Sequence, residues 1–232
     1  RDFCLSRGLG DVYKRQESCK QKALEHFTDS DSECLTDSAL GEFYLPDMPV
    51  LSADEDQHAF QRRMDEYYME IALKQARQAE KLDEVPIGAV VVRGGEIVAL
   101  GYNRREIDND PAGHAEFIAL KSASEALGVW RLSGCTVYVT LEPCLMCAGL
   151  MYQSRIDRCV YGASDPKAGA LGSLYSVNSD ERLNHCFEVT SGVLEEECVE
   201  VLQSFFRKKR QRNKERKRQA RLDVDGYDKE AK

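Results

Sequence analysis

Short apolar runs alternate with longer segments of helical periodicity along most of this chain, and this alternation constrains the fold more than any other feature. Runs rich in β-branched residues predict strands at residues 87–92, 96–103, 136–141, 158–161 and, at a sheet edge, 188–191. Segments with apolar residues three and four apart predict helices at residues 60–79, 115–127, 144–153 and 194–216. Strands that alternate with helices favour a layered α/β domain.

The 232 residues are enough for one sizeable α/β domain with tails at both ends. We expect adapter-derived or foreign residues at 1–16, an acidic disordered extension at 17–58, the folded domain at 59–206, and a basic helix end and tail at 207–232. No apolar run is long enough to span a membrane, so no membrane partner is expected.

Cysteine usage predicts the compartment. The chain has nine cysteines, an odd number, and its N-terminus lacks the pattern of a secretory signal. These features favour a reducing environment, and we expect a cytoplasmic location. Four cysteines lie in or beside apolar segments and are expected to be buried: Cys135, Cys159, Cys186 and Cys198.

The charge is unevenly distributed. The formal net charge is −8, and acidic residues are concentrated before Phe60. Residues 207–221 are instead strongly basic, with Glu215 as the single acid. A basic run of this density is typical of a phosphate-binding segment, and equally of a solvated terminal helix. Charge alone does not separate these two interpretations.

Two motifs carry the chemistry: His114-Ala115-Glu116, and Pro143 followed by Cys144-Leu145-Met146-Cys147. Either motif alone has little meaning, because isolated HxE and CxxC patterns are common. Together, each at the start of a predicted helix, they form the signature of zinc deaminases that act on nucleobases. A redox function for the CxxC pair is disfavoured by the HxE partner and the preceding proline.

The ligand types agree with a catalytic zinc site. His114, Cys144 and Cys147 supply three protein ligands and leave the fourth tetrahedral position open to water. Glu116 is expected to take a proton from the activated water and deliver protons to the ring nitrogen and the departing amine. The backbone N–H groups of Ala115 and Cys144, at the two helix starts, are expected to stabilise the tetrahedral centre.

Residues from about 60 to 210 resemble the bacterial-type tRNA-specific adenosine deaminases well beyond the zinc motifs. The matching segments are Val85-Pro86-Ile87-Gly88-Ala89, Gly101-Tyr102-Asn103-Arg104, Tyr138 to Cys144, Met146-Cys147-Ala148-Gly149, Ser154-Arg155-Ile156, Gly162-Ala163-Ser164-Asp165, Gly169 to Ser173, Asn184-His185 and Ser204-Phe205-Phe206-Arg207. The resemblance implies a three-layer α/β/α cytidine deaminase-like fold with a mixed, mostly five-stranded sheet. Residues 59–206 would then be the zinc deaminase domain.

The same resemblance implies the reaction and the partners. The expected reaction is hydrolysis of the wobble adenosine to inosine, in a homodimer that binds the anticodon stem-loop of tRNA and holds one Zn²⁺ per subunit. Asn103 matches the residue that hydrogen-bonds the flipped base, and Asp165 matches the one that reaches the ribose 2′-OH. Phe206, Arg207 and Arg210 match the helix that borders the RNA. From the residues alone, a turn or cap asparagine after a strand would be favoured for Asn103, and the alternative for Asp165 is a loop cap beside Pro166.

Two other functions remain open at this stage. One is a zinc deaminase of free nucleosides or bases with the same fold, which the matching loops disfavour. The other is an inactive RNA-binding subunit that retains zinc structurally, which the presence of Glu116 disfavours.

Overall fold

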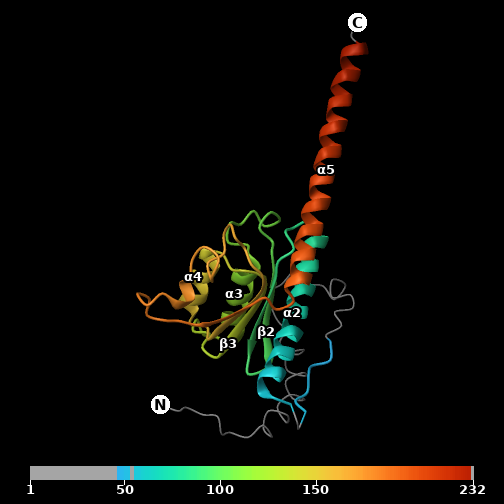
Figure 1. The fold of residues 1–232 in the computed structure, drawn as a ribbon. Helices are drawn as coiled ribbons and strands as arrows, with labels where there is room; N and C mark the ends of the chain where they lie inside the picture. Colours follow the sequence, from blue (N-terminus) through green and yellow to red (C-terminus); the bar gives the residue numbers. More distant parts are fainter. Residues whose placement is uncertain (1–45, 53–54, 231–232) are drawn as a thin grey trace. The chain divides into compact units, whose positions relative to one another are not determined.

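The computed structural model describes residues 46–52 and 55–230, and it contains a five-stranded mixed sheet between helices (Figure 1). This is the three-layer α/β/α arrangement expected from the resemblance. The expected segment 1–16 and most of the expected extension 17–58 lie outside the described residues. In the described part, no helix is long and apolar enough to cross a membrane.

The sheet has the order β2-β1-β3-β4-β5. The strands are β1 (Gly88–Arg93), β2 (Glu96–Tyr102), β3 (Cys135–Leu141), β4 (Arg158–Ala163) and β5 (Glu188–Ser191). β1 is antiparallel to both β2 and β3, whereas β3, β4 and β5 run parallel to one another. The carboxyl ends of β2, β3 and β4 therefore lie at one edge of the sheet, where open α/β sheets bind their ligands.

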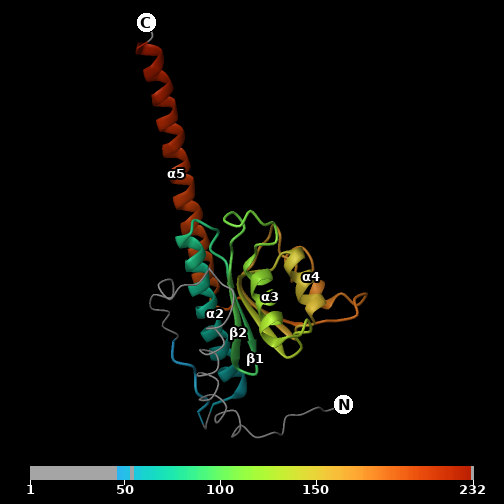
Figure 2. The same cartoon turned by 180° about the vertical axis from the view of Figure 1, so that it is seen from behind.

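Helices cover both faces of the sheet, as the views from the front and from behind show (Figures 1 and 2). The helices are α2 (Gln57–Lys81), α3 (Ala115–Leu127), α4 (Leu145–Ser154), α5 (Glu195–Glu230) and the 3-10 turn η1 (Val177–Ser179). α3 and α4 pack on one face, and α2 and the first part of α5 on the other. Gly101 allows the close approach of α3, because a Cβ there would lie 2.3 Å from the carbonyl oxygen of Ala115.

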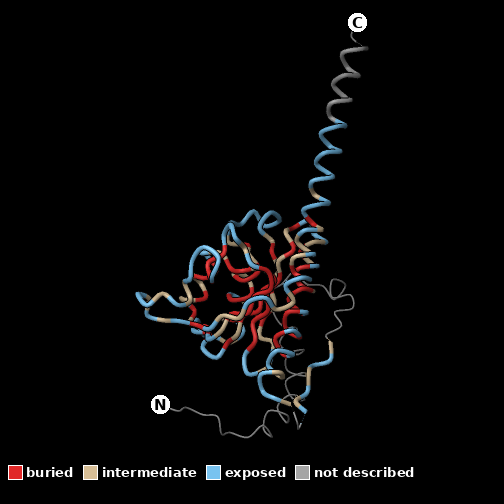
Figure 3. Tube along the Cα trace, viewed as in Figure 1, coloured by how far each residue is buried: buried red, intermediate tan, exposed pale blue. Residues whose placement is uncertain are grey.

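Side chains of the central strands alternate between the two helical layers, and buried residues fill both interfaces (Figure 3). Val137 and Val139 belong to the core cluster under α3 and α4. Tyr138 points to the opposite layer and donates a hydrogen bond to Asp65 of α2 (3.0 Å). Asp65 also receives a bidentate pair from Arg158 at 2.7 and 2.8 Å, which ties α2 to β4.

Two expectations from the sequence are wrong. The last helix does not end near Arg216 but continues to Glu230, because Arg, Lys, Gln and Glu are strong helix formers and no proline interrupts them. Cys186 is exposed rather than buried, since it lies in the loop before β5, whereas Cys135, Cys159 and Cys198 are buried as expected.

Candidate metal centre and active site

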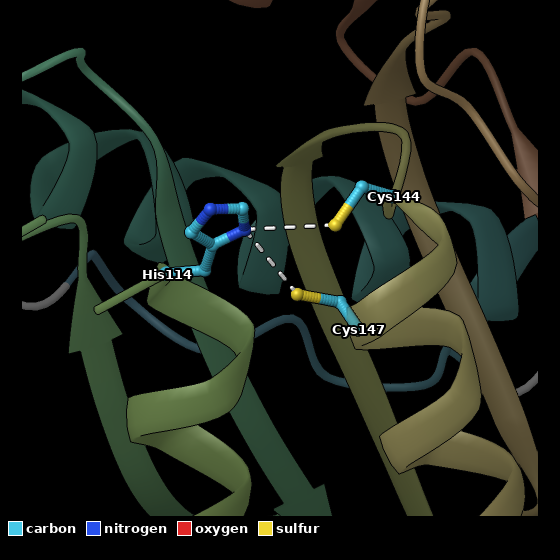
Figure 4. Close-up of side chains that lie close together, drawn as sticks. All are labelled: His114, Cys144 and Cys147. Atoms are coloured by element: carbon cyan, nitrogen blue, oxygen red, sulfur yellow. Dashed lines mark hydrogen bonds between the residues drawn. The ribbon is translucent and has the colours of Figure 1, made fainter. Parts of the chain in front are cut away.

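Three ligand-type side chains converge at the carboxyl edge of the sheet (Figure 4). His114 is the N-cap residue of α3, and Cys144 is the N-cap residue of α4, with Cys147 one turn further along α4. The His114 Nδ1 atom lies 3.6 Å from Cys144 Sγ and 3.5 Å from Cys147 Sγ. All three ligand atoms lie within 4.8 Å of one another.

These separations fit a tetrahedral zinc ion. Zn–S bonds of about 2.3 Å and Zn–N bonds of about 2.1 Å at a tetrahedral angle require nitrogen and sulfur to be about 3.6 Å apart. The observed 3.5 and 3.6 Å agree with that requirement. No fourth His, Cys, Asp or Glu joins the group among the described residues, so the protein supplies three ligands and leaves one position for water or substrate.

The electrostatics of the group favour a metal ligand. Hydrogen bonds from Cys147 and from His114 lower the pKa of the Cys144 thiol to about 3. The contact with Cys144 in turn raises the pKa of His114. The hydrogen bond with Cys144, together with burial, raises the pKa of the Cys147 thiol. The site thus stabilises one thiolate, at Cys144, which is the form of cysteine that binds metals and lies at a helix N-terminus that favours negative charge.

Glu116 lies in the first turn of α3, two residues after His114, and is only 4% exposed. Burial raises the pKa of its carboxyl group, which also interacts with Cys147. A carboxyl group with a raised pKa beside a metal position is suited to accept and return a proton.

The same residues line a cavity of about 220 Å³. Its lining includes the chemistry-bearing residues named from the sequence, which are His114, Glu116, Cys144, Asn103 and Asp165. Asn103 follows β2 directly and is 4% exposed, and Asp165 lies in the loop after β4. The ends of three strands and the starts of two helices therefore place these five side chains around one hollow.

Asp165 has a local structural role in its loop. Its Oδ1 accepts hydrogen bonds from the backbone N–H groups of Lys167 (2.9 Å) and Ala168 (3.3 Å). This is the loop cap considered from the sequence. The cap uses one carboxylate oxygen, and it directs the loop along the cavity wall.

Two buried glutamates in the cavity wall were not identified as site residues from the sequence. Glu84 is 1% exposed and Glu142 is 2% exposed, and each accepts backbone N–H groups of a loop that borders the cavity. The signal available in the sequence is a glutamate one or two residues before a proline, near the end of a predicted element, in Glu142-Pro143 and Glu84-Val85-Pro86.

The remaining predicted positions lie at the start of α3 and in the middle of α5. Ala115 is the first residue of α3, so its N–H group has no partner one turn earlier in the helix. Phe206 is 41% exposed on α5, whereas the neighbouring Phe205 is buried. Arg207 forms an exposed ion pair with Glu200 at 3.3 Å, and Arg210 is exposed.

Comparison with known proteins identifies several relatives. Residues 64–210 match the MafB19-like deaminase family. The chain is 52% identical over 150 residues to the tRNA-specific adenosine deaminase of Bacillus subtilis (strain 168), which covers 65% of this chain and 93% of the relative. It is 48% identical over 151 residues to the enzyme of the same name from Haemophilus influenzae, with 65% and 87% covered.

Solved structures give the same picture. A structure from a study of A-to-I editing by tRNA:A34 deaminases at the wobble position superimposes with a TM-score of 0.57 at 47% identity, covering 59% of this chain and 99% of that one. A guanine deaminase from Nitrosomonas europaea superimposes with a TM-score of 0.52 at 26% identity, covering 60% and 83%.

Proposed function

The chain belongs to the MafB19-like deaminases and, among them, to the family of tRNA-specific adenosine deaminases, and from this membership we propose that it hydrolyses adenosine to inosine at the wobble position of tRNA. The observation that carries the proposal is the convergence of the His114, Cys144 and Cys147 ligand atoms beside a cavity that His114, Cys144 and Glu116 line. The reaction consumes one water and releases ammonia. We assign it to residues 59–206, with residues 207–232 as the basic end.

One zinc ion per subunit would be held by the His114 Nδ1 atom and the Cys144 and Cys147 sulfur atoms. When bound, zinc supplies a Lewis acid that lowers the pKa of a water molecule to about 7. Glu116 would take one proton from the attacking water and give it to the ring nitrogen. It would then move the second proton of that water, from the hydroxyl on the ring carbon, to the departing amine. Its burial and raised pKa suit this exchange. The N–H groups of Ala115 and Cys144 would stabilise the tetrahedral centre.

Substrate recognition is assigned to the two loops beside the cavity. Asn103 would hydrogen-bond the flipped base. Asp165 would accept the hydrogen bond of the ribose 2′-OH with Oδ2, because Oδ1 already accepts two backbone N–H groups. A pocket that reads both base and sugar would separate RNA from DNA and from free bases.

The basic helix α5 is proposed as the RNA-bordering element. Phe206, Arg207 and Arg210 are exposed there. Two neighbouring cations are engaged within the protein, since Lys208 pairs with Glu80 at 2.9 Å and Arg212 pairs with Asp83. Arg210 lies between them in the sequence, and we assign it to the phosphates of the anticodon stem-loop.

A homodimer is proposed from the outer face of α3 and α4. An apolar hollow of about 570 Å³ lies there, separate from the metal centre, and is lined by residues that include Phe117, Leu120, Trp130 and Leu150. Trp130 is 60% exposed. An exposed apolar surface of this kind is typical of a protein interface.

The cytoplasmic location expected from the cysteines stays a prediction.

The test is a comparison of substrates. The protein is incubated with a transcribed arginine tRNA that carries adenosine at the wobble position, with the same tRNA carrying guanosine there, and with free adenosine and cytidine. We expect inosine in the first tRNA alone. Uridine or inosine from the free nucleosides would favour the nucleoside deaminase, and no product from any substrate would favour an inactive subunit.

A further inference from the structure

Glu84 is a buried carboxylate whose surroundings are unusual for an anion. It is 1% exposed and lies in the cavity wall. Its Oε2 accepts a hydrogen bond from Asn103 Nδ2 at 2.9 Å, and its Oε1 accepts the backbone N–H groups of Glu106 and Ile107, both at 2.7 Å. Burial of a carboxylate is costly unless donors satisfy it, so these three contacts determine what this residue does.

The end of α2 fixes the position of Glu84. Leu82 and Asp83 close the helix, with Asp83 in the left-handed region at φ 62°. The backbone N–H of Glu84 then returns to the carbonyl oxygen of Ala79 at 3.0 Å. This pattern is that of a Schellman C-cap, which turns the chain sharply after the helix. The turn sends the side chain of Glu84 inward to the cavity wall.

The backbone of Asn103 is fixed separately. Its N–H donates to the carbonyl oxygen of Ile87 at 3.0 Å, next to the first pair of the β1–β2 ladder. What remains to be set is the orientation of the side-chain amide, whose two ends differ as donor and acceptor. A carboxylate only accepts, so Glu84 requires the NH₂ end of Asn103 to face it. One N–H of that group and the carbonyl oxygen are left for the substrate.

We propose that Glu84 is a positioning residue that holds the Asn103 amide in one orientation for recognition of the base. The inference rests on the proposed function, and it adds a determinant of base capture outside the metal centre. Glutamine at this position could donate as well as accept, so it would allow the Asn103 amide to turn over. It would also place an amide N–H against the N–H groups of Glu106 or Ile107.

The test compares two RNA hairpins with the same anticodon loop, one with adenosine and one with an abasic site at the wobble position. All proteins carry Glu116→Ala so that the RNA is not turned over. The ratio of the two Kd values measures the contribution of base capture. Glu84→Gln should reduce that ratio by about tenfold or more, as expected when a turned Asn103 amide leaves a buried polar group of the base without its hydrogen-bond partner, with little change for the abasic hairpin.

Glu70→Gln is the matched control, because Glu70 lies on α2, the helix that precedes Glu84, and is exposed. It should leave both Kd values unchanged. In an Asn103→Ala background, Glu84→Gln should reduce the ratio by less than about threefold, since the group through which it acts is gone. Zinc content and the urea midpoint of each variant report folding, and Glu84→Asp, which keeps the acceptor, should retain more base capture than Glu84→Gln.

The outcomes distinguish a failure of the proposed function from a failure of the proposed role of Glu84. A ratio near one with Glu84 intact would refute base capture from tRNA and, with it, this inference. Two outcomes would overturn the role of Glu84 alone. One is a large ratio of the two Kd values that Glu84→Gln leaves unchanged, and the other is a Glu84→Gln protein that binds both hairpins more weakly by the same factor. If Glu84→Gln does not fold, a Glu84→Ala protein, which lacks the acceptor, replaces it. A Glu84→Ala protein that folds and has an unaltered ratio of the two Kd values would overturn the role of Glu84 as well.

Discussion

Substitution of Gly169 by alanine tests how the loop after β4 is held against the metal-binding turn. A Cβ at Gly169 would lie 2.3 Å from the Cδ and Oε2 atoms of Glu142. That carboxylate cannot swing aside freely, because it accepts the N–H groups of Asp165 (3.0 Å), Leu171 (3.1 Å) and Ser173 (3.0 Å). Relief of the clash must therefore move either the loop or the glutamate.

The expected cost has two contributions. Overpacking of a well-packed site costs about 1–3 kcal/mol. Loss of one hydrogen bond to a charged group costs about 1.5–3 kcal/mol more. We therefore expect Gly169→Ala to lower the free energy of unfolding by about 2.5–6 kcal/mol. Asp165 belongs to this loop and lines the cavity. Displacement of the loop should therefore also lower kcat/KM on the tRNA.

The assay is urea unfolding followed by steady-state kinetics on the wobble-adenosine tRNA. Gly149→Ala is the control, since Gly149 lies inside α4 and a Cβ there meets nothing within 4 Å. That change should raise the stability by about 0.5–1 kcal/mol, the usual gain for alanine in a helix. A typical substitution lowers the free energy of unfolding by about 1 kcal/mol. If Gly169→Ala lowers it by no more than about that amount, the close packing against Glu142 does not hold the loop.

Other predictions concern sugar recognition, the basic helix and the core. Asp165→Asn should weaken the rejection of DNA, so that the ratio of kcat/KM for matched RNA and DNA hairpins falls; an equal ratio in both proteins would leave Asp165 as a loop cap. Truncation after Phe206 should weaken tRNA binding and flatten its salt dependence by about 0.7–0.9 per lost phosphate contact, whereas an unchanged slope would mark a solvated helix. Asp65→Asn should destabilise the fold by about 3–5 kcal/mol in urea, because it breaks the buried pair with Arg158, and a loss below 1 kcal/mol would contradict that role.

Local pattern was sufficient to predict most elements and the metal centre. The helix at Ala115–Leu127 and the strand at Glu188–Ser191 have the bounds that periodicity predicted. The metal ligands were predictable because HxE and PCxxC each place ligand-type side chains at a helix start. Each motif occurs once in the sequence, so each has a single possible partner. The strand order was not predicted, because periodicity does not specify which strands pair, and the resemblance implied only a mixed, mostly five-stranded sheet.

The roles of Glu84 and Glu142 were not predictable in this way. Glu84 meets Asn103 at a separation of 19 residues, and Glu142 meets Leu171 at 29 residues. Contacts of such range depend on the folded sheet, which brings the ends of separate strands to one edge. A glutamate one or two residues before a proline at the end of an element indicates locally that such a contact exists. It does not identify the partner of that contact.

The central claim is that the cavity around His114, Cys144, Cys147 and Glu116 deaminates the wobble adenosine. It is tested most directly by single-turnover formation of inosine in the arginine tRNA by the wild type and by Glu116→Ala, with zinc content and tRNA Kd measured on the same preparations. We predict one zinc per chain and equal Kd in both proteins, with the rate constant lower by at least about 10²–10⁴-fold in Glu116→Ala. A variant that forms inosine at a near wild-type rate would contradict the account.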